Sequence, residues 1–273
     1  MKNSVQSYNK IKGRSNAALT KVASFAVFLA QRIGSAFRLI DNPIFRTIRF
    51  ISARNNKLMI GGGGEHEVFV VSTSDKAIGL SVYANQRPYD FEKFEQAFRL
   101  LDKNRKNRLL IEVGANIGTI CIPAIRRGFF ETAIVFEPEP LNFSLLNGNI
   151  HLNRLSSRIT PHQLALGSVA NQKLSFELSA DNSGDHRVHF KSEQGAFNEE
   201  KRKIIEVVST RFDSIFDNII ADETLVWIDT QGFEGHVLDG ARNAIKTRVP
   251  LCLEFGPIGW RAATVLKCCG KFF

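Results

Sequence analysis

Two acidic residues stand where chemistry is expected, each at the end of a short apolar segment. Glu137 follows the apolar residues 133–136, and Asp229 follows residues 225–228. Apolar runs of this length are typical of strands buried on both faces of a parallel sheet. Because ligands of open α/β sheets bind at the carboxyl ends of the strands, both carboxylates are expected at a binding edge. Pro138 cannot donate to a sheet ladder and keeps the preceding residue extended, which favours a strand end at Glu137.

A glycine turn precedes Glu137 and follows a third apolar run. That run, residues 109–113, contains Glu112 and leads into the turn Gly114-Ala115-Asn116-Ile117-Gly118. The glycines permit positive φ angles and leave no Cβ in the path of a ligand. Glu137 follows the turn by about 20 residues, the interval at which an acidic side chain reaches the hydroxyls of a ribose. The turn is not G-x-G-x-x-G and no G-K-[ST] is near it, which argues against a pyrophosphate or triphosphate ligand.

The groups around the turn indicate a ligand with a carboxylate, a ribose and a positive centre. Backbone N–H groups of the turn suit the carboxylate, and the turn is flanked by Glu112 and Glu137 rather than by cations. S-adenosylmethionine (SAM) has these three parts, and its sulfonium tolerates nearby acids. The turn alone is equally compatible with an unrelated α/β protein, because short glycine motifs recur by chance.

Five segments in a fixed order carry a more specific signal. They are Glu112-Val113-Gly114-Ala115-Asn116-Ile117-Gly118, Phe136-Glu137-Pro138, Leu146-x-x-Asn149-x-x-x-Asn153, Ala165-Leu166-Gly167 and Ile228-Asp229-x-x-Gly232-Phe233-Glu234. Together they resemble the FkbM family of SAM-dependent methyltransferases, over approximately residues 68–257. The resemblance implies an α/β fold with a doubly wound, mostly parallel Rossmann-like methyltransferase sheet. The chain departs from the family pattern at Glu112, Trp227 and Gln231, where members commonly have Asp, Lys and Glu, so the substrate class is less defined than the cofactor.

The resemblance also implies an activity and a set of site residues. It implies an O-methyltransferase that carries a methyl group from SAM to a hydroxyl oxygen of a small molecule, a glycan or a lipid-linked sugar. The implied cofactor-binding residues are Glu112, Gly114, Ala115, Asn116, Gly118, Glu137, Pro138 and Ala165. The catalytic candidates are Asp229, which would face the methyl group and accept the hydroxyl proton, and Glu234. Asp229 alternatively caps the following helix, and a metal between these two acids is a weaker option, so no metal site is predicted.

Three other classes of protein share parts of this pattern. A nicotinamide oxidoreductase would have the strand, the turn and Glu137, but it should show G-x-G-x-x-G. A nucleic-acid methyltransferase would explain a basic amino-terminal segment, yet that segment lacks the interleaved aromatics of a stacking platform and no N-P-P-Y or D-P-P-Y occurs. Nucleic acid is therefore an unlikely partner. The third alternative is an inactive, truncated methyltransferase-like protein that binds no cofactor.

The basic character of the chain is concentrated at its amino-terminal end. The formal net charge is +9, and residues 1–60 hold eleven lysines and arginines against the single acid Asp41. We expect a basic helical leader and glycine linker over residues 1–64 and a methyltransferase domain over residues 65–273. The apolar residues 22–30 are far short of the roughly 20 needed to cross a bilayer. They suit a basic amphipathic helix on an anionic membrane, or, slightly favoured, a helical extension that packs on the domain or is partly disordered.

The remaining pattern predicts how the domain is built. Strands are expected at residues 67–71, 77–83, 158–166 and 251–255, with helices at 91–101 and from Pro140 to about 153. Segments 173–179, 187–190 and 204–209 are expected as strands outside the parallel set, with the turn at 181–185 as the lip of the acceptor site. About 15 residues beyond the last strand cannot supply the helix and strand pair that normally close such a sheet. We therefore expect a truncated end, or a sheet that ends early. The four cysteines show no zinc spacing, which favours reduced thiols and a cytoplasmic protein, with peripheral membrane contact left open.

Overall fold

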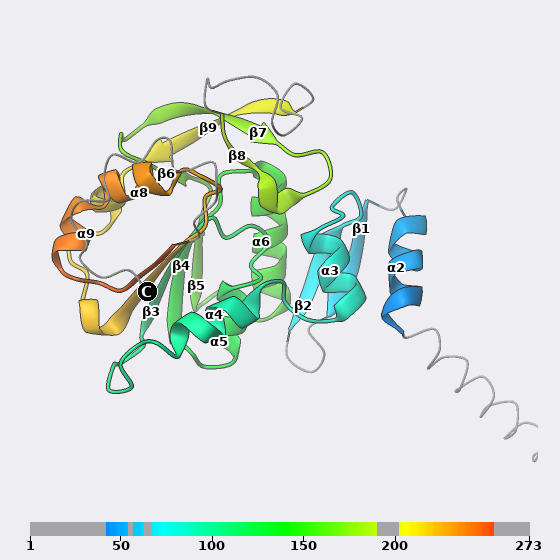
Figure 1. Ribbon diagram of the computed structural model, residues 1–273, viewed down its shortest axis with the longest axis horizontal. Coiled ribbons are helices and arrows are strands. Elements are labelled where there is room, and N and C mark those ends of the chain that lie inside the picture. Colours follow the sequence, from blue (N-terminus) through cyan, green and yellow to red (C-terminus); the bar gives the residue numbers. More distant parts are fainter. Residues whose placement is uncertain (1–41, 54–56, 63–66, 190–201, 254–273) are drawn as a thin grey trace, which may run out of the picture. The chain divides into compact units, whose positions relative to one another are not determined.

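Five parallel strands form the central sheet of the computed structural model, which describes residues 42–53, 57–62, 67–189 and 202–253. The order across the sheet is β11-β10-β3-β4-β5, of which Figure 1 labels β3, β4 and β5. The strands are β3 (Leu109–Val113), β4 (Thr132–Phe136), β5 (Ile159–His162), β10 (Thr224–Ile228) and β11 (Leu251–Leu253). The chain order reverses between β3 and β10, as in a doubly wound sheet. The predicted α/β class is confirmed.

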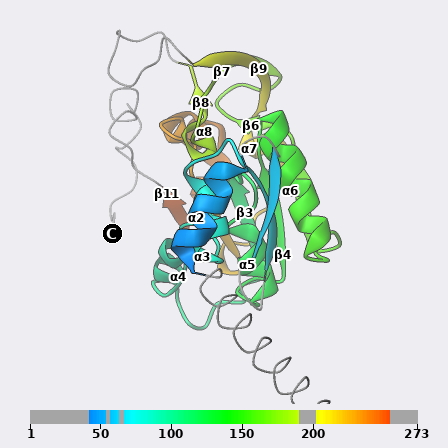
Figure 2. The ribbon, with the colours of Figure 1, turned by 90° about the vertical axis from the view of Figure 1, so that its right-hand side faces the viewer.

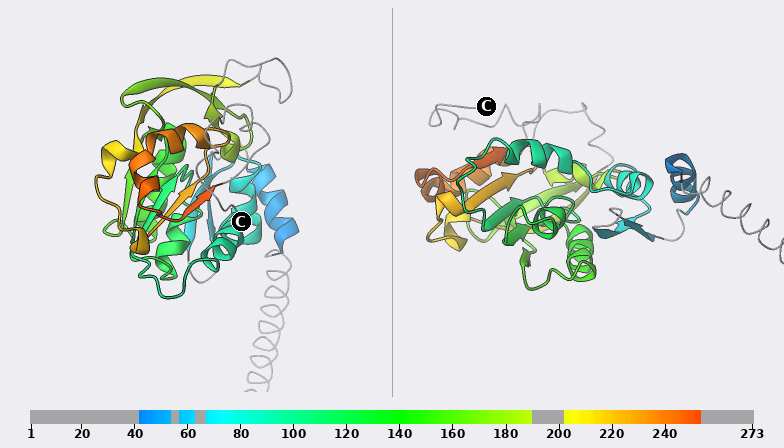
Figure 3. Two further views of the ribbon diagram at one scale, coloured as in Figure 1. Left: turned by 60° about the vertical axis from the view of Figure 1, so that its left-hand side comes forward. Right: turned by 90° about the horizontal axis from the view of Figure 1, so that it is seen from below.

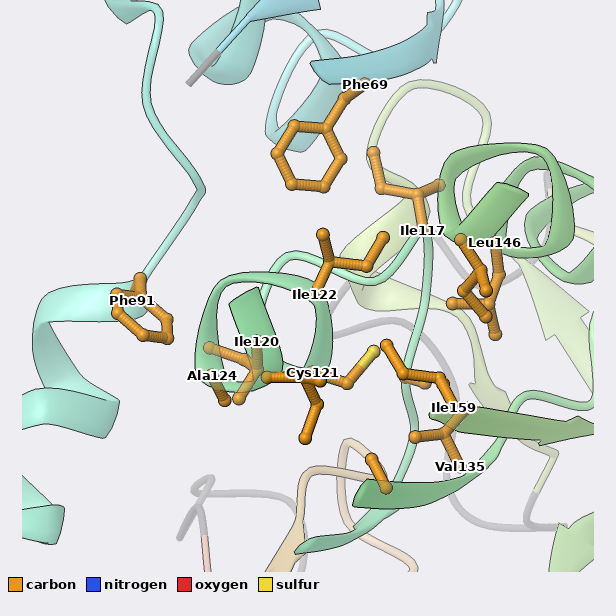
Figure 4. Close-up of a cluster of buried hydrophobic side chains, with 14 of the residues drawn as sticks. Phe69, Phe91, Ile117, Ile120, Cys121, Ile122, Ala124, Val135, Leu146 and Ile159 are labelled. Atoms are coloured by element: carbon orange, nitrogen blue, oxygen red, sulfur yellow. The ribbon is translucent and has the colours of Figure 1, made fainter. Parts of the chain in front are cut away.

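Helices cover both faces of this sheet because its strands are apolar on both sides. One face carries Leu110 and Val135 and packs against α4 (Phe91–Phe98), α5 (Cys121–Arg126) and α6 (Pro140–Leu152). The other carries Ile111 and Val226 and packs against α7 (Phe212–Ile215), α8 (Glu234–Gly240) and α9 (Arg242–Lys246). Figure 4 shows how α5 places Ile122 on one side and Cys121 toward Val135 and Ile159 of the sheet. The predicted helices from residue 91 and from Pro140 are confirmed.

A second sheet lies beyond the carboxyl ends of the central strands (Figure 3). Its order is β6-β9-β7-β8, with β7 antiparallel to both neighbours. The strands are β6 (Ala165–Leu166), β7 (Gln172–Leu178), β8 (Arg187–Val188) and β9 (Lys203–Thr210). The three strands expected outside the parallel set are therefore confirmed. A short 3-10 turn, Ser183–Asp185, lies at the predicted turn between β7 and β8.

The predicted strand over residues 158–166 is wrong in its extent. The chain forms β5 in the central sheet, leaves it at residues 163–164, and then forms β6, which pairs with β9. The two segments follow each other in one apolar-rich run. Such a run indicates extended chain but carries no signal for a change of partner strand.

The predicted strand over residues 77–83 is also wrong, because this segment forms helix α3 (Ile78–Asn85). Asp75 accounts for the start of the helix: its Oδ1 accepts the N–H of Ala77 and its Oδ2 accepts the N–H of Gly79. The helix is short and buried on several sides, so its apolar residues lack the one-sided spacing that distinguishes a surface helix from a strand.

The division of the chain differs from the expected boundary after residue 64. The chain divides into the units Met1–Arg49 and Phe50–Phe273. Gly61 and Gly62 belong to β1 (Leu58–Gly62), which pairs antiparallel with β2 (Val68–Ser72). A Cβ on Gly61 would lie 3.0 Å from the Cα of Tyr83, so this glycine allows close packing on α3 rather than a linker. In Figures 1 and 2 the β1–β2 pair lies beside α6.

Two expectations fall on residues outside the described ranges. In the first unit the described part is helix α2 (Pro43–Ser52), which continues into the second unit. The amphipathic segment expected within residues 22–40 and the end of the chain after Leu253 are not described. Among the helices that are described, none has the length and apolarity needed to span a membrane.

Candidate functional site

A cavity of about 550 Å³ opens at the carboxyl ends of β3, β4 and β10, at the point where the strand order reverses. Open α/β sheets bind ligands in this crevice. Phe176 of β7 and Val188 of β8 line its far side, so the second sheet helps to enclose it. Tyr89 and Trp227 add aromatic surface to the wall. The size lies within the range of small-molecule and cofactor sites.

The glycine turn after β3 has the backbone that its sequence predicts. Gly114 and Gly118 both have φ of 92°, and Asn116 between them has φ of 50°. A Cβ on Gly114 would lie 1.8 Å from the carbonyl oxygen of Asp229, so glycine permits the ends of β3 and β10 to approach. Gly118 is not among the described residues that line the cavity, and its missing Cβ makes room for Ile122 instead.

The N–H groups of the turn are engaged within the protein, which differs from the expectation of an open cradle for a carboxylate. Gly114 and Ala115 donate to the carbonyl oxygen of Phe136, and Gly118 donates to that of Ala115. The N–H of Asn116 donates to Glu137 Oε2 at 2.8 Å. The bonds from Gly114, Ala115 and Asn116 fix the start of the turn against β4 and the residue that follows it. Thr119, next along the chain, also lines the cavity.

Glu137 lies at the end of β4 with its carboxylate buried in the cavity wall. Besides Asn116, the N–H of Glu139 donates to its Oε1 at 2.9 Å. Burial raises the pKa of Glu137 to about 7, against the effect of these two bonds. Each carboxylate oxygen has a second lone pair, so the group can still accept hydrogen bonds from a ligand. Pro138 and Ala165 line the same cavity, and their role in cofactor binding stays a prediction.

Glu112 places a second buried acid at the floor of the cavity. In the sheet register it stands between Val135 of β4 and Trp227 of β10, on the face covered by α5. The N–H of Cys121 donates to its Oε2 at 3.1 Å. Burial raises the pKa of Glu112 to about 8, and the charges of Asp229 and Glu137 raise this pKa further.

The two catalytic candidates have different positions. Asp229 lines the cavity, and its Oδ1 accepts a hydrogen bond from Gln231 Nε2 at 2.7 Å. Glu234 is not among the described lining residues. Its carboxylate accepts the N–H and hydroxyl of Thr230 and the N–H of Gly232, which holds the turn after β10 in place. A catalytic role for Glu234 stays a prediction without support from its position.

Asn142 and His186 are polar residues of the cavity wall that sequence reasoning did not single out. Asn142, in the first turn of α6, is buried, and its Nδ2 has no hydrogen-bond partner within the described part of the chain. His186 follows the predicted lip, and its Nδ1 accepts the N–H of Ser179 at 3.0 Å, which leaves the ring proton on Nε2. Burial lowers the pKa of His186, so the ring is neutral. The turn signal at 181–185 pointed toward His186, whereas nothing in the helical pattern marks Asn142.

The charge of the lining favours neutral or cationic ligands. Glu112, Glu137, Asp229 and Asp90 all line the cavity, whereas among the described residues Lys93 is the one Lys or Arg that does so. Lys93 Nζ pairs with Asp90 at 2.6 Å. In residues 42–53, 57–62, 67–189 and 202–253, no group of three or more His, Cys, Asp and Glu side chains could hold a metal ion.

The strand order and the site together define a doubly wound α/β protein with a ligand cavity at its switch point. Residues 112–261, more than half of the chain, match the Methyltransferase FkbM domain. The chain therefore belongs to the FkbM methyltransferase family. This membership confirms the resemblance carried by the five ordered segments.

Several solved structures are distantly similar. Methyltransferase FkbM from Methylobacillus flagellatus KT matches at 18% identity and a TM-score of 0.37, covering 77% of this chain and 48% of that chain. TYW2 from M. jannaschii in complex with AdoMet matches at 21% identity and a TM-score of 0.29, covering 42% of this chain and 49% of that chain. The N-terminal domain of human METTL16 in complex with SAH matches at 12% identity and a TM-score of 0.28, covering 57% of this chain and 46% of that chain. The chain thus spans about half the length of each. No curated protein matches it.

Proposed function

We propose that this methyltransferase transfers a methyl group from SAM to a hydroxyl oxygen of a small molecule, a glycan or a lipid-linked sugar. One observation carries the proposal: Glu112, Glu137 and Asp229 converge on one cavity at the switch point of the sheet. Three acids around one cavity, with a single lysine in its described lining, suit a ligand with a positive centre. Within a methyltransferase family, a cationic methyl donor is the simplest such ligand.

The residues present fit SAM as cofactor. Glu137 would accept hydrogen bonds from the ribose hydroxyls through the lone pairs that the turn leaves free. Pro138, Leu164 and Ala165 line an apolar part of the cavity that suits the adenine. The acidic groups would stabilise the sulfonium. When bound, SAM would supply the methyl group, and its sulfur would leave as a neutral thioether that needs no acid to protonate it.

Asp229 is the group best placed to act on the acceptor. Since the leaving sulfur takes up no proton, the protein has to align the acceptor hydroxyl and remove its proton. Asp229 stands at the cavity with Oδ1 oriented by the Gln231 amide. We propose that it accepts the hydroxyl proton. Asn142 Nδ2 and His186 Nε2 are neutral donors that would hold other oxygens of the acceptor.

A nucleic-acid acceptor is the second candidate, and the lining argues against it. Nucleic acid is held mainly by Lys and Arg on its phosphates. Among the described residues of the cavity wall the acids outnumber the single lysine, which is itself paired. That attraction would have to come from Lys and Arg outside the cavity wall, such as those of the basic leader.

The substitution Asp229→Asn tests the proposed role, because Asn keeps the size and the hydrogen bond but cannot take a proton. We expect SAM binding and folding to be retained, while methyl transfer falls about 100-fold or more, the usual contribution of a general base. The assay follows tritium from methyl-labelled SAM into sugar and lipid extracts. Alkali releases label held in methyl esters, so label in a methyl ether has to survive this treatment.

Two outcomes would contradict this proposal. Unchanged turnover in Asp229→Asn would remove the residue from proton transfer. Label found in RNA or protein, with none in hydroxyl-bearing small molecules or lipids, would replace the acceptor class. Glu131→Ala, an exposed acid on the same domain, is the matched control.

A further inference from the structure

Two asparagines, Asn149 of α6 and Asn153 at its C-cap, complete the open edge of β2. Asn153 Oδ1 accepts the N–H of Val68 at 3.0 Å, and its Nδ2 donates to the carbonyl oxygen of Val68 at 2.7 Å. Asn149 repeats the arrangement on Val70, at 2.7 and 3.3 Å. Residues four apart on a helix rise about 6 Å and residues two apart on a strand about 6.6 Å, so the spacings match. The two amides take the place of a neighbouring strand.

The two asparagines differ in one further bond. Asn149 Nδ2 also donates to the carbonyl oxygen of Ile117 at 3.0 Å, in the middle of the glycine turn. The corresponding second bond of Asn153 goes to the carbonyl oxygen of Asn149 at 2.8 Å, inside α6 itself. Both side chains are buried, so neither group can exchange its partner for water without opening the structure.

The bond to Ile117 holds the turn one residue after Asn116, the last residue of the Gly114–Asn116 stretch that lines the cavity. Ile117 follows Asn116, whose N–H holds Glu137, and precedes Gly118. Figure 4 shows the side chain of Ile117 next to Phe69 of β2. The turn is therefore held by β2 through apolar contact on one side and by Asn149 through its carbonyl on the other.

We infer that Asn149 is a positioning residue of the cofactor site, which couples the β1–β2 pair to the glycine turn. This inference rests on the proposed function, because the turn positions Glu137 for the ribose. Losing the bond frees the Ile117 carbonyl and lets the Asn116 peptide turn away from Glu137. Asn153 supports β2 in the same way but has no bond to the turn, so it provides a control within one helix.

The test compares Asn149→Ala with Asn153→Ala in the full-length protein, using S-adenosylhomocysteine as the calorimetric probe. Each variant loses the bonds to one residue of β2 and one further carbonyl, so we expect similar losses of melting temperature. We expect Asn149→Ala to weaken binding about tenfold and Asn153→Ala to change it less than twofold. Hydrogen exchange of peptides covering residues 112–120 should quicken in Asn149→Ala alone.

If the two variants bind S-adenosylhomocysteine with equal affinity, whether unchanged or equally weakened, the inference is overturned. If alanine prevents folding, the pair Asn149→Ser and Asn153→Ser replaces it, with the same expectations. Wild-type protein that binds no S-adenosylhomocysteine would contradict the proposed function instead. The exchange comparison then decides the coupling without a ligand: equal exchange of the turn in both variants would contradict it.

Discussion

Glu112 and Glu137 are acids that the fold keeps partly protonated near neutral pH. Burial raises their pKa values to about 8 and about 7, from an ordinary value of 4.5. The cause is that β3 and β4 carry them into the sheet's interior, where the charged form loses its water. A bound cation would lower both pKa values. The two carboxyl groups are therefore partly protonated in the free protein and would ionise when a positive ligand binds.

A dependence of stability on pH follows for Glu112. A raised pKa means that the folded state binds more protons than the unfolded state between pH 4.5 and about 8. Stability contributed by the protonated group is therefore lost as pH rises through this window, at about 1.4 kcal/mol per unit. Glu112→Gln removes that loss, and its carbonyl can still accept the Cys121 N–H.

Melting curves at pH 6 and pH 8 measure this effect. We expect the melting temperature of Glu112→Gln to rise relative to wild type by several degrees between the two values, at roughly 2–4 °C per kcal/mol. The other groups titrate in both proteins, so the difference reports Glu112 together with its coupling to Glu137 and Asp229. Parallel pH profiles would show that its carboxylate is not buried as described.

Most acidic site residues could be placed from the sequence, because a strand end fixes them. Glu112, Glu137 and Asp229 all face the cavity as expected. Glu234 shows where spacing is insufficient: four residues after Thr230, its carboxylate reaches back to the turn instead of the cavity. Asn142 could not be found, because a polar residue in the first turn of a helix is ordinary.

At the scale of elements, glycines bring segments together rather than making room for a ligand. A Cβ on Gly240 of α8 would lie 2.0 Å from the carbonyl oxygen of Gly167, just after β6. Gly167 belongs to one of the five motif segments, whereas Gly240 lies outside them. Gly114 and Asp229 meet in the same way between β3 and β10. The motifs were recognisable, but which segments they join depends on the folded arrangement.

The substitution Gly240→Ala tests this packing. We expect a loss of at least about 2 kcal/mol, because the added methyl group meets backbone that cannot move aside. Gly148→Ala on α6 is the matched control, since its Cβ would meet nothing within 4 Å. Alanine there should stabilise the helix by about 0.5–1 kcal/mol. If urea unfolding shows that both substitutions change the free energy of unfolding in the same direction, this interpretation of Gly240 is contradicted.

The sequence predicts most accurately the elements that have one clear pattern. The buried runs of β3, β4 and β10 are short, apolar and bounded by turns. Helix α3 was missed because its start depends on the side chain of Asp75, and its apolar residues surround the helix. The change of sheet between β5 and β6 was missed because strand partners are a property of tertiary structure.

At the scale of the whole molecule, the basic charge of the first unit bears on where in the cell the protein acts. The first unit ends at Arg49, and its helix α2 exposes Ile44, Phe45 and Ile48 beside Arg46 and Arg49. Apolar and basic residues on one short helix suit an anionic membrane surface. We propose that the leader mediates peripheral contact with such a membrane.

Deleting residues 1–49 tests this proposal and leaves β1 in place. We expect the full chain to sediment with phosphatidylserine vesicles and the shortened chain to remain in the supernatant, with unchanged circular dichroism per residue of the domain. Sedimentation should weaken with salt, since part of the attraction is electrostatic. If the shortened chain still binds the vesicles, or if the full chain does not bind them, the proposed membrane contact of the leader is contradicted.

The central claim is that the switch-point cavity binds SAM through Glu137. Calorimetric titration of the full-length protein with SAM measures it most directly, with Glu137→Ala as the variant, Glu137→Gln as its isosteric alternative and Glu131→Ala as control. Hydrogen bonds to charged groups contribute about 1.5–3 kcal/mol each, so we predict one site per chain and at least tenfold weaker binding in Glu137→Ala. No heat of binding in wild type, or the same affinity in the folded Glu137 variants and wild type, would contradict the claim.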